Sequence, residues 1–133
     1  MTLFTLLLSA QIFFAPQDFP ELPPLSVTAA DIVSVAVEYK ILQEDNPVFC
    51  RQFYGMTDYN SRTITICTIP DIATQRRTLL HEIVHVLYWN AGINSGGPYE
   101  HAVERKADEL YRELYGIKPI GQKPVATQET KAE

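Results

Sequence analysis

Basic side chains, histidine and cysteine are all scarce in this sequence of 133 residues. It has 11 Lys and Arg residues against 16 Asp and Glu residues, a formal net charge of −5, three histidines and two cysteines. A protein that binds a phosphate backbone needs a clustered basic face, and the only adjacent basic pairs here have acidic neighbours, so we predict no nucleic-acid partner. The length allows one small domain and no second sizeable core.

The amino-terminal segment lacks charged side chains altogether. The run from Thr2 to Ala15 is uncharged, and the first basic residue is Lys40. This run is shorter than the roughly 20 apolar residues of a membrane span, and we do not favour membrane contact by residues 2–15. It has the length of a signal-peptide core but no basic leader and poor cleavage points, so a signal segment and a segment buried against the domain remain alternatives. We favour a cytoplasmic location, with secretion through an atypical signal as the alternative.

Two cysteines, Cys50 and Cys67, do not fix the redox compartment. If their segments form a hairpin that turns at Asp58 and Tyr59, the two cysteines lie opposite each other, and a disulfide is geometrically conceivable. Free buried thiols in a reducing cytoplasm account for them equally well.

Proline and polar segments divide the chain. Residues 1–24 combine the apolar segment with a Pro-rich arm, 25–117 form the predicted domain, and 118–133 form a flexible polar tail. Thr28 is a candidate N-cap for a short helix that continues through Ile41 and ends before Asn46. The β-branched residues of this segment make a strand the competing interpretation.

The remaining pattern predicts an α+β fold. Val48–Tyr54 and Thr63–Ile69 read as strands, and the turn-like Gly55–Arg62 joins them into an antiparallel β-hairpin. Two helices follow, at about Thr74–Asn90 and Pro98–Tyr115.

Two of the three histidines lie in one short motif inside the first of these helices. His81 and His85 are four residues apart and therefore project from one helix face, so that both imidazoles can reach one zinc ion at about 2.0–2.1 Å. Glu82 lies beside the first ligand, where its carboxylate can take a proton from metal-bound water and pass it to the leaving amine. The motif therefore predicts one Zn²⁺ per chain and hydrolysis of a peptide bond.

A catalytic zinc takes three protein ligands, and the last helix offers Glu100, His101 and Glu104 as candidates for the third. We predict Glu104, because Asp108 follows one turn later and can accept the second N–H of a zinc-bound histidine. The alternative is that both acids belong to a solvated face that pairs with neighbouring basic residues.

The motif, an eighteen-residue gap and Glu104-x-x-x-Asp108 together resemble the gluzincin zinc metallopeptidases. The stretch from Thr63 to Tyr115 most resembles the ImmA/IrrE branch, which typically has asparagine where this chain has Asp108. The resemblance implies a zincin-like fold, His81, His85 and Glu104 as ligands, and Glu82 as catalytic base. It also implies a polypeptide substrate that pairs with the strand before the active helix, through Thr63, Ile64, Thr65, Ile66 and Cys67. Residues 1–60 give no resemblance, and no helix-turn-helix domain is evident.

Three alternatives concern His101 and the activity. As third ligand, His101 would make the site resemble the SprT-type metallopeptidases. If Glu104 is the ligand, His101 is a candidate to stabilise the oxyanion, with the phenols of Tyr88 and Tyr99 as other candidates. The third alternative is a non-catalytic domain that zinc stabilises, for interaction or regulation. The sequence does not identify the substrate or the oligomeric state.

Overall fold

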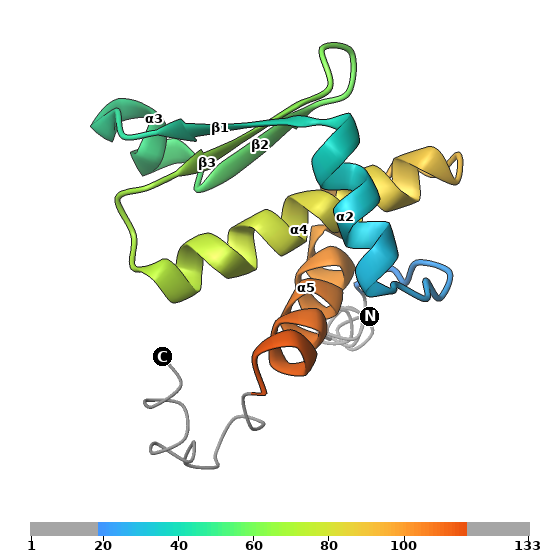
Figure 1. Ribbon diagram of the computed structural model, residues 1–133. Coiled ribbons are helices and arrows are strands. Elements are labelled where there is room, and N and C mark those ends of the chain that lie inside the picture. The colour runs from blue at the N-terminus through green and yellow to red at the C-terminus, as the bar shows by residue number, and fades with distance from the viewer. Residues whose placement is uncertain (1–18, 117–133) are drawn as a thin grey trace, which may run out of the picture.

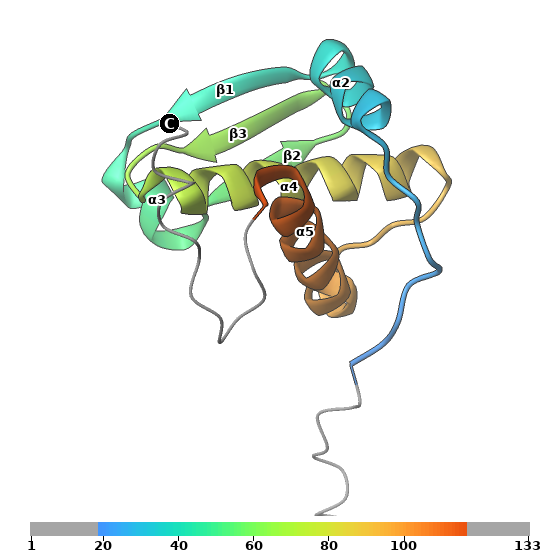
Figure 2. The ribbon, with the colours of Figure 1, turned by 60° about the horizontal axis from the view of Figure 1, so that its bottom comes forward.

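A three-stranded sheet, a long helix and a second helix lie in successive layers in the computed structural model, which describes residues 19–116 (Figures 1 and 2). The predictions for residues 1–18 and for the polar tail 118–133 lie outside the described residues. Within the described part, no helix has the length and apolar character needed to cross a membrane.

The elements confirm the predicted α+β class. In chain order they are α2 (Ala29–Glu38), β1 (Lys40–Glu44), α3 (Pro47–Gln52), β2 (Gly55–Asp58), β3 (Thr63–Cys67), α4 (Ile72–Asn90), a 3-10 turn (Gly97–Tyr99) and α5 (Glu100–Tyr115). The two long helices lie where the sequence predicts them, within two residues at each end. The segments before them differ more.

Helix α2 begins at the predicted cap and ends earlier than predicted. The Thr28 hydroxyl accepts a hydrogen bond from Asp31 N at 3.1 Å, and the Asp31 carboxylate accepts one from Thr28 N at 2.8 Å. This reciprocal box satisfies two backbone donors that a helix start leaves without partners. The helix stops at Glu38, and the chain continues as strand β1. Both interpretations of the segment therefore hold, each for one part of it.

The prediction of a strand over Val48–Tyr54 is wrong, because residues 47–52 form helix α3. The Asn46 side chain caps this helix by accepting from Val48 N at 2.8 Å, and Pro47 occupies the first turn, where its missing N–H costs nothing. The predicted hairpin exists, but its first strand is β2, which lies in the segment predicted to be turn.

The sheet order is β1-β3-β2, which places β3 in the centre. Strand β1 pairs with β3 in parallel, with Ile41 opposite Ile64, and β2 pairs with it antiparallel, with Thr57 opposite the same residue. The backbone of β3 is thus paired on both sides, and it has no edge to offer to a substrate strand. This corrects the prediction that residues 63–67 bind substrate; the sheet edge that contacts α4 belongs to β2 (Figure 2).

Helix α4 is buried on two faces, each of which supports its own core. One face packs against α5, and the other packs against the sheet and α2. The α5-side core contains Leu80, Val84, Tyr88, Val103, Ala107, Leu110 and Tyr111, and the sheet-side core contains Val35, Tyr39, Ile64, Ile66, Ile83 and Val86. The position and rotation of α4 are therefore fixed by apolar contacts on both sides, at about 25 cal/mol per Å² buried.

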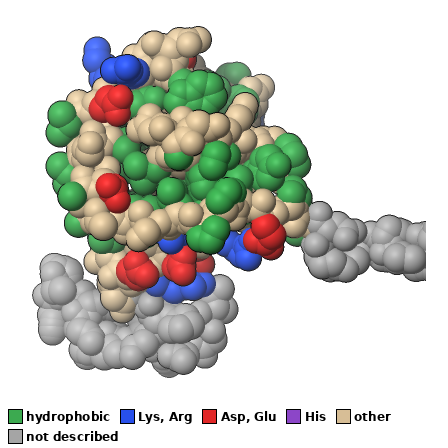
Figure 3. Space-filling model, turned by 90° about the vertical axis from the view of Figure 1, so that its right-hand side faces the viewer, with side chains coloured by type: hydrophobic (Ala, Val, Ile, Leu, Met, Phe, Trp, Pro, Cys, Tyr) green, Lys and Arg blue, Asp and Glu red, His purple; other side chains and the backbone are tan. Residues whose placement is uncertain are grey.

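The Pro-rich segment packs against this framework. The Tyr88 hydroxyl donates to Pro23 O at 2.7 Å, Leu22 packs on the α5-side core, and Glu21 pairs with Arg105 at 3.2 Å. On the face of the molecule shown in Figure 3, the few Lys and Arg side chains lie beside Asp and Glu side chains.

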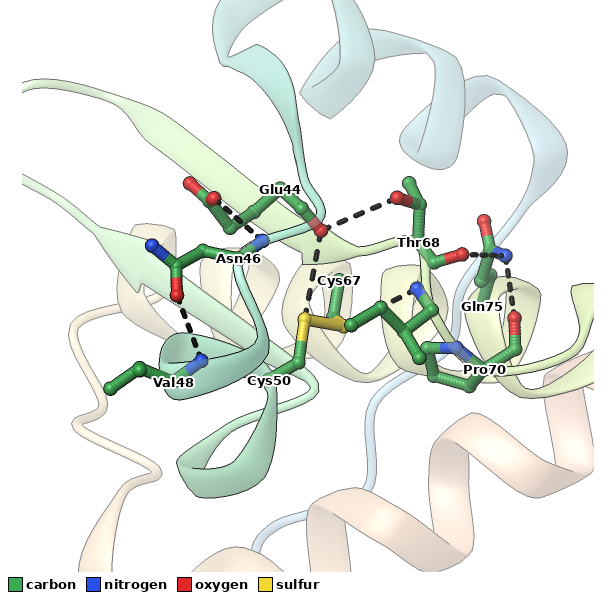
Figure 4. The surroundings of a disulfide bond; sticks show 9 residues. Glu44, Asn46, Val48, Cys50, Cys67, Thr68, Pro70 and Gln75 are labelled. Atoms are coloured by element: carbon green, nitrogen blue, oxygen red, sulfur yellow. Dashed lines mark hydrogen bonds between the residues drawn. A yellow bond between two sulfur atoms is a disulfide. The ribbon is translucent and has the colours of Figure 1, made fainter.

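A disulfide joins Cys50 of α3 to Cys67 at the end of β3, with a Cα–Cα distance of 5.7 Å (Figure 4). It links a helix to a strand, whereas the sequence suggested two opposed strand residues. Next to it, Thr68 N donates to Glu44 O at 2.9 Å, and the Gln75 side chain donates to Thr68 O and Pro70 O at 3.2 and 2.7 Å. These bonds tie α3, the sheet and the start of α4 together at one end of the molecule.

Candidate metal centre and cleft

The third face of α4 carries the candidate site. Asp71 caps the helix by accepting from Thr74 N at 3.3 Å, and the helix then continues without interruption to Asn90. Its residues at helical spacing, which share one face and line a cleft, are Thr74, Arg77, Thr78, His81, Glu82 and His85. Because the other two faces are packed, this face is held toward the cleft.

The two histidines of the motif meet a carboxylate from α5. His81 Nε2 lies 2.8 Å from Glu100 Oε1, His85 Nε2 lies 3.2 Å from the same oxygen, and the two nitrogens lie 3.2 Å apart. Glu100 is the first residue of α5, so the crossing of α5 over α4 brings it to the histidines. These three residues form a group that could hold a metal ion.

The donor set and its dimensions fit zinc. Two ligands held tetrahedrally at about 2.0–2.1 Å from zinc lie about 3.3 Å apart, and the three donor atoms here are 2.8–3.2 Å from one another. Small outward movements of these side chains would admit the ion. Two imidazoles and one carboxylate are also a common ligand set of catalytic zinc, which leaves a fourth position open.

The outward-facing nitrogens of both imidazoles have partners as well. Glu104 Oε1 lies 2.7 Å from His81 Nδ1, and the buried hydroxyl of Ser95 lies 2.7 Å from His85 Nδ1. Such contacts leave Nε2 of each ring directed at the metal position and fix the ring orientation.

The electrostatics of the site favour a cation. Burial disfavours the charged form of His81, but hydrogen bonds to Glu104 and Glu100, together with the nearby Glu82 carboxylate, outweigh this and raise the pKa of His81. The bond from His81 lowers the pKa of Glu104. The same carboxylates that stabilise a proton on His81 would stabilise a metal ion.

Glu82 is buried, 7% exposed, and strand β2 holds it in place. The Thr57 hydroxyl donates to Glu82 Oε1 at 2.5 Å. Gly55 allows the strand to approach, because a Cβ atom there would lie 2.6 Å from the Thr78 methyl carbon and 3.2 Å from Glu82 Oε2. The strand therefore fixes the carboxylate beside the two imidazoles.

The cleft at the site has a volume of about 740 Å³ and two walls. We call residues 52–57, which run from the last residue of α3 to Thr57 of β2, the strand wall. The face of α4 together with Glu100 and Glu104 is the helix wall. Beyond the strand wall, Tyr59 stacks on Trp89 with ring centroids 4.2 Å apart. Burial, together with the Glu82 carboxylate, raises the pKa of Tyr59 to about 12, so its phenol remains a hydrogen-bond donor at neutral pH.

Several residues predicted for the site lie elsewhere. Asp108 lies two turns after Glu100 on α5, about 12 Å further along the helix axis. There its carboxylate pairs with Arg112 at 2.5 Å. The ring of His101 stacks on Phe19 with centroids 4.3 Å apart and does not line the cleft. The Tyr88 hydroxyl donates its hydrogen bond to Pro23 O, and neither Tyr88 nor Tyr99 lines the cleft.

The two acidic residues at the histidines are therefore Glu100 and Glu104, one helical turn before the predicted pair Glu104 and Asp108. Glu100 reaches both imidazoles, and Glu104 takes the outer position predicted for Asp108. The sequence indicates Glu100 as a candidate ligand but does not indicate Ser95, Thr57 or Tyr59. Nothing local singles these three out, because each becomes part of the site only through the packing of a loop or strand on α4.

Comparison of the chain with family models, with curated proteins and with solved structures gives no match in any of the three.

Proposed function

We propose that this protein is a zinc-dependent metallopeptidase of the gluzincin type, with His81, His85 and Glu100 as ligands. The observation that carries the proposal is a buried carboxylate, Glu82, held beside a three-donor metal group that opens into a cleft. A structural zinc site is closed by four protein ligands and needs no base. A hydrolytic site needs both an open position and a base.

When bound, zinc would supply a Lewis acid that polarises the substrate carbonyl and acidifies water. Glu82 takes a proton from the attacking water while the water oxygen bonds to the carbonyl carbon. As the C–N bond breaks, the same carboxyl passes this proton to the leaving amine. Thr57 keeps Glu82 oriented, and Tyr59 is the cleft donor we assign to the oxygen that gains charge.

The outer edge of β2, which pairs with no other strand among residues 19–116, supports a peptide as the substrate. Strand β2 lies at the end of the sheet order and borders the cleft through Gly55, Met56 and Thr57. An extended chain can add to such an edge through main-chain hydrogen bonds, which recognise any polypeptide backbone. The ImmA/IrrE branch remains part of the proposal on the motif alone.

The decisive experiment compares the wild type with Glu82→Gln. We expect about one zinc per chain in both proteins by mass spectrometry of metals, and hydrolysis of a casein or peptide-library substrate by the wild type alone. Glu109→Gln on the solvent side of α5 is the control and should remain active. Hydrolysis by Glu82→Gln would exclude the role of Glu82. Zinc in both proteins without hydrolysis by either, combined with unfolding on chelation, would instead support a domain that zinc only stabilises.

A further inference from the structure

The strand wall exposes bulky apolar side chains at one end of the cleft. Phe53, Tyr54 and Met56 are 44%, 54% and 41% exposed, and all three line the cleft. A ligand that covered these side chains would gain about 25 cal/mol of binding free energy for every Å² of apolar surface removed from water. Grouped within four residues beside a metal site, they form a surface suited to apolar ligand groups.

The position of this surface along the cleft follows from contacts across it. Gly55 lies against Thr78, Thr57 contacts Glu82, and Tyr59 stacks on Trp89. The two walls therefore run in the same direction, and Phe53 and Tyr54 lie toward the end formed by the first turns of α4. The apolar surface is thus to one side of the metal group and does not cover it.

The charged side chains of the cleft are also concentrated at the end that holds the histidines. The three cleft carboxylates, Glu82, Glu100 and Glu104, are all at the histidines, and the strand wall has no charged residue. Arg77 also lines the cleft, but its guanidinium lies over the Tyr111 ring of α5, 5.2 Å from the centroid, where it helps to lower the pKa of Glu104. A basic substrate side chain beside Phe53 and Tyr54 would lose hydration with no carboxylate to pair with, whereas an apolar one would gain from burial there.

We propose that the cleft selects an extended polypeptide carrying a large apolar side chain on the Phe53–Tyr54 side of the metal group, and disfavours a basic side chain there. This inference rests on the proposed function of the same cleft. It names the substrate class: segments with exposed Phe, Leu or Met residues, as found in unfolded chains or flexible loops.

Binding to a protein that cannot turn over tests the selection. Zinc-loaded Glu82→Gln would be titrated with three fluorescein-labelled Ser/Thr peptides that differ only in a central Phe, Ser or Lys. Fluorescence anisotropy should show the Phe peptide binding about tenfold tighter than the Ser peptide and the Lys peptide binding weakest. Equal affinity for Phe and Ser, tighter binding of Lys, or no binding of any peptide overturns the inference.

Variants on the same background locate the effect. Phe53→Ser combined with Tyr54→Ser, and separately Met56→Ser, should reduce the preference for Phe. Val37→Ser, at an 81% exposed position on α2 away from the cleft, should leave it unchanged. A preference that survives the double variant contradicts the assigned surface. Wild-type protein with the same peptides keeps the two proposals apart: peptides that bind with this preference but stay intact support the recognition surface and contradict peptidase activity.

Discussion

The two walls of the cleft differ in what holds their side chains. On the helix wall, Glu82 and His85 are 7% and 6% exposed and are bonded to Thr57 and Ser95. On the strand wall, Phe53 and Tyr54 are about half exposed, and a disulfide bounds the segment that carries them. The α4 side chains of the helix wall thus have the fixed geometry that metal binding requires, and the strand wall has exposed apolar side chains that we propose contact a ligand.

The largest effect should come from the helix wall, where Glu100 and Glu104 have different partners. Glu100→Ala should weaken zinc binding by more than roughly 100-fold, because it removes a ligand, and Glu104→Ala by roughly 10–100-fold, the usual cost of an outer partner. Competition with a chelating dye measures both affinities. Asp108→Asn is the control and should bind zinc like the wild type. If Glu104→Ala is the weaker binder, the original ligand prediction is correct and our assignment is reversed.

The next effect concerns the strand wall as a whole. Replacing Cys50 and Cys67 together by serine opens a loop that contains all of β2, since the two cysteines are 17 residues apart. We expect a loss of about 3 kcal/mol in the free energy of unfolding, measured by urea denaturation. Zinc affinity should not change, because α4 and α5 lie outside the loop. A parallel loss of zinc affinity would show that the two walls are not independent.

The hydrogen bond that joins the walls gives a smaller effect. Thr57→Val keeps the shape of the side chain but leaves the buried Glu82 carboxylate without its donor, at a cost of about 2 kcal/mol. We expect roughly a tenfold fall in kcat, with zinc content unchanged. Thr57→Ser retains the hydroxyl and should stay near the wild-type rate. Equal rates for the valine and serine variants would remove Thr57 from the mechanism.

The smallest effect tests how closely the walls approach. Gly55→Ala should cost about 1–2 kcal/mol, because its Cβ would meet the Thr78 methyl group at 2.6 Å. Gly96→Ala is the control, since its Cβ would meet only the Asn94 side chain, at 3.4 Å. Adding Thr78→Ser removes the methyl group and should restore most of the loss. Thermal melts of the wild type, the two alanine variants and the double variant measure these differences. Equal melting temperatures for the two alanine variants would contradict the close approach.

The sequence by itself determined the parts whose information is local. His81, Glu82 and His85 share one helix because four-residue spacing is a property of a single helix, and Thr28 with Asp31 identifies a helix start for the same reason. The ends of α4 at Asn90 and of α5 at Tyr115 are those the sequence predicts, whereas each helix begins two residues from its predicted start. The strand character of Thr63–Cys67 follows from its alternating pattern.

Only the tertiary structure decided which groups meet across elements. Glu100 and Glu104 sit on one helix one turn apart, and the crossing of α5 over α4 determines which of them reaches both imidazoles. Pairing of β1 with β3 removes the free edge of β3 and leaves the cleft edge to β2. Cys50 meets Cys67 from a helix that the β-branched and aromatic pattern concealed. Each of these outcomes depends on long-range packing, to which the local sequence pattern contributes only one of the two partners.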